Sequence, residues 1–151
     1  MDLSFRTAQQ TDLPELVALL ADDMLGVNRE DTSTPLNDRY LAAFRHIERD
    51  ENNELIVVHC ESELAGMLQL TFVPHLTHTG SWRCSIEGVR IARAFRGVGI
   101  GARLIEWAVE RARERGCKIV QLTSDKQRPD AIRFYESVGF RATHEGFKLA
   151  L

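Results

Sequence analysis

One stretch of this sequence constrains the fold more than any other. Three glycines alternate in Arg96-Gly97-Val98-Gly99-Ile100-Gly101, after a strand-like segment that ends at Ile91 and directly before a helical pattern that begins at Ala102. Glycine has no Cβ, so the backbone there can turn tightly and a ligand can approach its N–H groups. The first N–H groups of a helix lack internal partners and lie at the positive end of the helix dipole. The stretch therefore predicts a strand, a turn and a helix N-terminus that bind a phosphate or pyrophosphate, with Arg96 adding a positive charge.

Two familiar phosphate-binding loops fit this stretch less well. A nucleoside-triphosphate loop needs Lys and then Ser or Thr after its glycines, whereas Gly101 is followed by Ala102 and Arg103. The dinucleotide fingerprint tolerates Ala102 at its third glycine position. However, the stretch lies two-thirds of the way along the chain, and too little sequence follows to build the second half of a dinucleotide fold. A nicotinamide cofactor is therefore the weaker interpretation.

The same residues resemble the GNAT superfamily of acetyl-CoA-dependent N-acetyltransferases. Arg96 to Gly101 fits every fixed position of the signature Arg/Gln-x-x-Gly-x-Gly/Ala of that superfamily. Asp130-Ala131-x-x-Phe134-Tyr135-x-x-x-Gly139-Phe140 resembles its second motif, and Phe5-Arg6-x-Ala8-x-x-x-Asp12-Leu13-Pro14 resembles its usual first strand and helix. The resemblance implies acetyl-CoA as cosubstrate.

The resemblance also implies which residues contact the cofactor. The backbone of Val89, Arg90 and Ile91 is expected to contact the pantetheine arm. The diphosphate is expected on the turn, at Arg96, Gly97, Val98, Gly99, Ile100, Gly101 and Ala102. GNAT enzymes often have an asparagine at the position of Arg128, so Arg128 either contacts a cofactor phosphate or belongs to a solvated basic turn.

Two residues are candidates for the acid and base chemistry. In the resembling motif the tyrosine protonates the departing CoA sulfur, and Tyr135 occupies that position. An amine nucleophile has a pKa near 10 and must lose a proton before it attacks. Glu87 resembles the glutamate that many GNAT enzymes use as the base or as the anchor of a water relay. The alternative for Glu87 is an ordinary strand glutamate that faces solvent.

The order of predicted elements indicates an α+β fold. We expect a strand at Leu3–Arg6, then a helix with Asp12 as N-cap and a capping-box Glu15. The residues expected on the inner face of that helix are Leu13, Leu16, Val17, Leu20 and Met24. We then expect a helix at 37–49, a hairpin of strands 54–60 and 64–73, and a strand at 82–91 with a bulge at Gly88. After the glycine turn we expect a helix that stops at Gly116 and a strand at 117–123 that pairs in parallel. The last expected elements are a helix at 129–137 and two short strands in 140–151. The predicted architecture is GNAT-like: a central mixed, mostly antiparallel sheet with helices on both faces.

The chain as a whole indicates one domain, residues 1–151. Its net charge of −3 gives no reason to expect nucleic acid or an anionic membrane as partner. The three cysteines have no metal-ligand spacing, His75-x-x-His78 lacks a third ligand, and so no metal is expected. No apolar run is long enough to span a bilayer and no signal pattern is present, so we expect a cytoplasmic protein.

These observations predict an N-acetyltransferase that moves acetyl from acetyl-CoA to a primary amine by direct attack in a ternary complex. The acceptor is expected to be a small molecule, and the acidic connection at 22–31 could attract its cationic amine. The segment from Asp125 to Tyr135 weakly resembles aminoalkylphosphonate N-acetyltransferases. A protein or peptide N-acetyltransferase and a non-catalytic CoA-binding regulatory module remain as alternatives. GNAT enzymes are commonly dimers, which implies a homodimer.

Overall fold

The computed structural model describes residues 1–151, and the chain divides into two compact units, Met1–Gln121 and Leu122–Leu151. The first unit holds five strands, β1 (Leu3–Thr7), β2 (Asn53–Cys60), β3 (Glu63–Pro74), β4 (Trp82–Ile91) and β5 (Cys117–Gln121). Its helices are α1 (Leu13–Ala21), α2 (Asp38–Arg49), the short α3 (Thr77–Gly80) and α4 (Ile100–Glu114), with 3₁₀ turns at Gln10–Asp12, Gly26–Asn28 and Arg93–Phe95. The second unit holds α5 (Pro129–Ser137).

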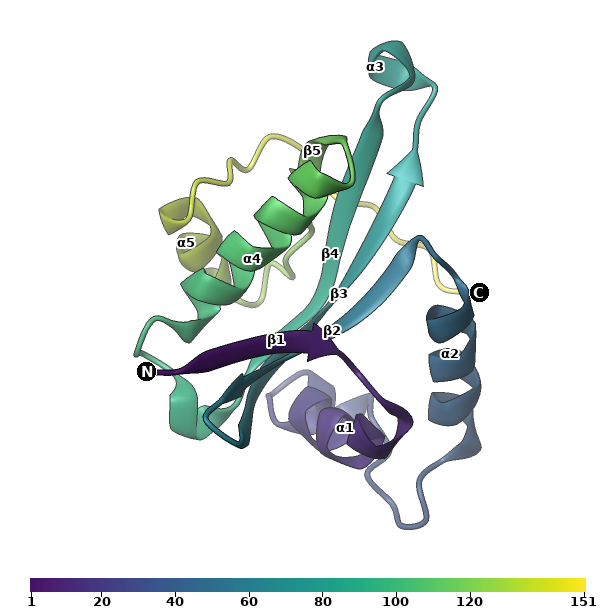
Figure 1. The fold of residues 1–151 in the computed structure, drawn as a ribbon, viewed down its shortest axis with the longest axis vertical. Coiled ribbons are helices and arrows are strands. Elements are labelled where there is room, and N and C mark those ends of the chain that lie inside the picture. The colour runs from purple at the N-terminus through teal and green to yellow at the C-terminus, as the bar shows by residue number, and fades with distance from the viewer. The chain divides into compact units, whose positions relative to one another are not determined.

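The five strands form one sheet in the order β1-β2-β3-β4-β5 (Figure 1). The first three pairings are antiparallel, and β4 pairs with β5 in parallel. The parallel pair follows from the sequence, because α4 forms the crossover that a parallel connection requires. The expected mixed, mostly antiparallel sheet is confirmed.

Helices cover both faces of this sheet (Figure 1). On one face, α4 packs its buried Leu104, Ile105 and Ala108. The sheet residues of this face include Val58, Leu68, Leu70, Phe72, Cys84 and Ile86, all buried. On the other face, Leu16 and Leu19 of α1 form a core cluster with Val57 and Met67. We call the two faces the α4 face and the α1 face.

Three local expectations are wrong. Asp12 does not cap α1 with its side chain; instead its carboxylate binds Arg6 at 2.7 and 2.9 Å and accepts the backbone N–H of Gln9, which stabilises the 3₁₀ turn before the helix. Met24 is 67% exposed because α1 already ends at Ala21. The tail 140–151 forms no strand, since it pairs with no other segment.

The remaining elements agree with the sequence. α2 begins after Asn37, whose side chain caps the helix by accepting the N–H of Arg39, and β2 and β3 are joined by the tight turn at Glu61 and Ser62. None of the helices combines the length and the apolar character needed to cross a bilayer.

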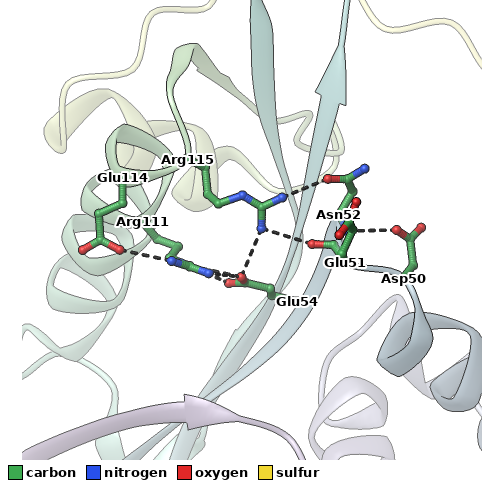
Figure 2. Close-up of polar contacts among 7 residues, drawn as sticks. All are labelled: Asp50, Glu51, Asn52, Glu54, Arg111, Glu114 and Arg115. Atoms are coloured by element: carbon green, nitrogen blue, oxygen red, sulfur yellow. Dashed lines mark hydrogen bonds and ion pairs between the residues drawn. The ribbon is translucent and has the colours of Figure 1, made fainter.

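An ion-pair network fixes the C-terminal end of α4 to the start of β2 (Figure 2). The guanidinium of Arg111 binds both carboxylate oxygens of Glu54, whose side chain is 12% exposed. Arg115 lies 3.5 Å from the same carboxylate, donates to Asn52, and stacks over the Phe72 ring at 4.1 Å. Because one half-buried carboxylate serves two arginines, the network depends on its charge.

We therefore expect Glu54→Gln to destabilise the protein by about 2 kcal/mol, because the amide cannot neutralise Arg111 and Arg115. The control is Glu114→Gln, which removes an exposed partner of the same Arg111 and should cost less than about 0.5 kcal/mol. Urea denaturation of both variants measures the difference. Equal losses of free energy of unfolding would contradict this role of Glu54.

Candidate active site

The backbone of β4 is paired on both edges only in its first half. β5 pairs with β4 from Trp82 to Ser85. β3 continues alongside β4 as far as Ile91. From Ile86 onward, the β4 edge on the β5 side therefore has no strand to receive its N–H and C=O groups. An unpaired strand edge of this kind is a template for an extended polar ligand.

A bulge lies in the same part of β4. The register pairs Gln69 with Glu87 and Met67 with Arg90, so that Gly88 and Val89 together face the single residue Leu68. Gly88 has a φ of +64°, a conformation that only glycine adopts without strain, and the expected bulge is thus confirmed. The extra residue bends the strand where its free edge begins.

The glycine turn follows at the end of β4 and leads into α4. Gly97 and Gly99 have φ values of +76° and +89°, and a Cβ at either position would have no atom within 4 Å. No side chain caps α4, and the first hydrogen bond that closes the helix runs from the Arg103 N–H to the Gly99 carbonyl. The N–H groups of Ile100, Gly101 and Ala102 therefore have no helical acceptor. The turn combines free donors, the helix dipole and open space, as an anion site requires.

Arginines around this turn bind the connection after α1. Arg90 Nε lies 3.0 Å from Asp23 Oδ2, in an ion pair whose side chains are 14% and 16% exposed. Arg93 binds Asp22 at 2.7 Å, and this hydrogen bond lowers the pKa of the Asp22 carboxyl and raises that of Arg93. Arg96 Nε donates to the Ile91 carbonyl at 3.0 Å. The ends of α1 and β4 are thus held together beside the turn.

The rest of the acidic connection has internal partners as well. Glu30 accepts the Tyr40 hydroxyl at 3.0 Å. Asp31 accepts bonds from Ser33 and Asn37, which lower the pKa of its carboxyl to about 2. Hydrogen bonds to these acidic residues therefore stabilise the conformation of the connection.

Glu87 lies on the α1 face of the sheet and is exposed. Directly paired residues point to the same face, so a set of polar side chains runs across β3, β4 and β5 there. We call it the polar stripe: Gln69, Thr71, Arg83, Ser85, Glu87 and Gln121. The sequence analysis included Glu87 but missed the other five, although the alternation of Arg83, Ser85 and Glu87 along a strand is a signal that could have found them.

Tyr135 and Arg128 belong to the second unit. Tyr135 is half-buried on α5, with edge-to-face contacts to Phe134 and Phe140 at ring-centroid distances of 5.2 and 6.0 Å. Arg128 is the residue directly before α5 and is also half-buried. The helix Pro129–Ser137 agrees with the sequence expectation to the residue.

Comparison with known families identifies this arrangement. The model of the Acetyltransferase (GNAT) family matches residues 18–140. The chain belongs to this family. Members of the GNAT family use acetyl-CoA, whose diphosphate and extended pantetheine arm suit an uncapped helix start beside a free strand edge.

Individual relatives agree with the family assignment. Aminoalkylphosphonate N-acetyltransferase from Salmonella typhimurium is 36% identical over 89 residues, which are 59% of this chain and 57% of that enzyme. The chain thus matches little more than half the length of this curated relative. A solved structure from Bacillus halodurans C-125, described as a transcriptional regulator, is 55% identical, with a TM-score of 0.96 over 99% of this chain and 100% of that one. A putative acetyltransferase from Agrobacterium tumefaciens is 28% identical, with a TM-score of 0.84 over 98% and 99%.

The geometry of the turn predicts the effect of one methyl group. Gly99→Ala should weaken CoA binding at least about tenfold, because the new Cβ occupies the open space beside the helix N-terminus. It should also cost about 1 kcal/mol of stability from left-handed strain. Gly80→Ala is the matched control, since Gly80, the last residue of α3, has a φ of +66° and open space and lies far from the turn in sequence. Calorimetric titration with CoA and thermal unfolding separate the two effects, and equal CoA affinities in the two variants would contradict the assignment of the turn.

Proposed function

We propose that this protein is an acetyl-CoA-dependent N-acetyltransferase that acetylates the primary amine of a small molecule. One observation carries the proposal: a strand with a free edge is followed, after a short turn, by an uncapped helix N-terminus, and the Glu87 carboxylate lies on that strand where the free edge begins. A ligand with a diphosphate and an amide-containing arm matches the first two features. The carboxylate of Glu87 matches the need to remove a proton from an attacking amine.

The cofactor is held by backbone groups. The backbone of Val89, Arg90 and Ile91 contacts the pantetheine arm along the free edge of β4, where the Val89 and Ile91 carbonyls also accept hydrogen bonds from the Arg90 and Arg96 side chains. The N–H groups from Gly97 to Ala102 bind the diphosphate. Arg96 stabilises the turn by donating a hydrogen bond to the Ile91 carbonyl. When bound, acetyl-CoA supplies an activated acetyl thioester. Arg128 is proposed as a further phosphate contact in place of the usual asparagine.

Glu87 accepts the proton of the amine, directly or through a water molecule. Its exposed position on the α1 face lets an acceptor approach from solvent, and the neighbouring Gln69 and Ser85 offer neutral hydrogen bonds. A primary ammonium has a pKa near 10, so a carboxylate beside it is needed both to attract the cation and to take its proton.

Tyr135 donates a proton to the leaving thiolate. Its hydroxyl belongs to a half-buried side chain whose ring is fixed by two aromatic neighbours. A ring fixed in this way keeps its hydroxyl donor in one orientation from turnover to turnover.

Direct attack is favoured over an acyl-enzyme. Cys84 is buried on the α4 face, and burial raises the pKa of its thiol to about 12. Burial also raises the pKa of Cys117. Both thiols are therefore protonated at neutral pH and are poor nucleophiles.

The small-molecule acceptor is supported by the similarity to an aminoalkylphosphonate N-acetyltransferase.

A second candidate function, a CoA-binding regulatory module without catalysis, is favoured by one observation, the 55% identity to a protein described as a transcriptional regulator. The two functions differ in turnover, which the following experiment measures.

We expect the protein to release CoA thiol from acetyl-CoA in the presence of small primary amines, and Tyr135→Phe to lower kcat by about 100-fold with little change in the KM for acetyl-CoA. The chain has two tyrosines, and Tyr40→Phe is the matched control. It removes a hydroxyl that bonds only Glu30 and Asp31 and should retain most of the wild-type kcat.

Binding of CoA without turnover on any small amine or peptide would favour the regulatory module. Turnover on peptides alone would favour a protein N-acetyltransferase. A Tyr135→Phe variant with the wild-type kcat would remove the tyrosine from the mechanism.

A further inference from the structure

The polar stripe carries two opposite charges at its ends on β4. Arg83 and Glu87 lie on the same strand and point to the α1 face, with Ser85 midway between them. Their Cα atoms are four residue steps apart, which corresponds to about 13 Å along an extended strand. The stripe residues on β3 and β5 are neutral. The polar stripe therefore has a cation at one end, an anion at the other, and only neutral side chains otherwise.

Arg83 differs from the other arginines of the first unit. In that unit, every other half-buried arginine has a carboxylate partner: Arg6, Arg90, Arg111 and Arg115. The terminal nitrogens of Arg83 donate instead to neutral oxygens, at 3.4 Å to Gln121 and 3.1 Å to Thr77. Its Nε is buried and makes no hydrogen bond. A half-buried cation without an anion is costly, and an anionic ligand would compensate that cost.

The side chain of Arg83 is also linked to the centre of the stripe. Gln121 accepts from Arg83 through Oε1 and donates through Nε2 to the Ser85 hydroxyl at 3.3 Å. The amide of Gln121 thus connects the guanidinium to the Ser85 hydroxyl, and Ser85 is two residues from Glu87. An anion bound by Arg83 would therefore lie on the same polar stripe as an amine beside Glu87.

We propose that Arg83 binds an anionic group of the acceptor, so that this enzyme acetylates zwitterionic amines whose carboxylate, phosphonate or phosphate lies a few bonds from the amine. The proposal rests on the function proposed above and specifies its substrate class. The ammonium end is placed at Glu87 and the anionic end at Arg83. Arg83 is a specificity-determining residue and takes no part in the proton transfers.

The separation of the two charges limits the size of the acceptor. Arginine and glutamate side chains each reach several ångströms from Cα. When they extend toward each other, they shorten the roughly 13 Å between these backbone positions to the length of a short aliphatic chain. A polyamine would place a second ammonium against Arg83, and the repulsion between these like charges disfavours it.

The experiment compares amines that differ only in the anionic group. Thiol release from saturating acetyl-CoA is measured with β-alanine and 2-aminoethylphosphonate, with the neutral β-alaninamide and ethanolamine, and with spermidine. We expect kcat/KM to be highest for an anionic amine. Arg83→Gln should raise the KM of that amine by about 10- to 100-fold, the loss of a charge-assisted hydrogen bond, and leave kcat and the KM for acetyl-CoA nearly unchanged. Arg83→Lys should restore part of the affinity.

The control variant is Arg113→Gln, which removes an arginine charge from the exposed side of α4. It should leave the KM values of all acceptors unchanged. Equal KM increases for anionic and neutral amines in Arg83→Gln, or a preference of the wild type for spermidine or the neutral amines, would overturn the proposal. An increase in the KM for acetyl-CoA alone would assign Arg83 to the cofactor and overturn it as well.

A binding measurement separates this proposal from the proposed activity. Ethylphosphonate and propionate carry the anion without an amine, and calorimetry with the CoA-saturated protein measures their binding without any turnover. Binding of one of them by the wild type and by Arg113→Gln, with at least about tenfold loss in Arg83→Gln, supports the anion site even if no amine is acetylated. Which of the two binds distinguishes a phosphonate from a carboxylate acceptor. Absence of binding by the wild type overturns the anion site even if neutral amines are acetylated.

Discussion

The account depends on a strand that loses one of its neighbours halfway along. β5 pairs with β4 only as far as Ser85, whereas β3 accompanies β4 to Ile91. On the β5 side of Ile86–Ile91 no strand pairs with the backbone, and the carbonyls of Val89 and Ile91 accept instead from the Arg90 and Arg96 side chains. The other backbone groups of this edge are open to a ligand, since an amide without a partner costs free energy. The bulge at Gly88 bends the strand at the same place. Because only a 3₁₀ turn and the glycine turn separate the free edge from the uncapped start of α4, an arm and a diphosphate can be bound by neighbouring backbone segments.

Such a site requires α4 to be fixed in position while its N-terminus stays open. The fixation comes from the opposite end of the helix, where Arg111 and Arg115 share the Glu54 carboxylate (Figure 2), and from the buried side chains of the α4 face. At the open end, Arg90 and Arg93 bind Asp23 and Asp22. Acidic partners thus compensate the charges of Arg90 and Arg93 near the turn. We therefore expect the anion to be bound mainly by the backbone N–H groups at the start of α4.

The sequence predicted the parts of the fold that follow from local chemistry. The glycines of the turn, the alternation of side chains along β4 and the periodicity of α4 are local signals of these elements, and α5 was predicted to the residue. What it could not predict depends on tertiary partners. Asp12 has the residue type of an N-cap, yet Arg6 lies close enough in the fold to take its carboxylate. The two strands expected in 140–151 needed a partner edge that local pattern does not supply. Arg83 was overlooked because its lack of a carboxylate appears only once its neighbours are known.

Amide hydrogen exchange with and without CoA tests the central claim most directly. The account predicts that CoA slows exchange at the N–H groups of Val89 to Ile91 and of Gly97 to Ala102, while the amides of α2 and of the β1–β2 pair keep their rates, since they lie outside the proposed site. Protection that is absent from the turn, or that is confined to other elements, would contradict the claim that the free edge of β4 and the start of α4 bind the cofactor.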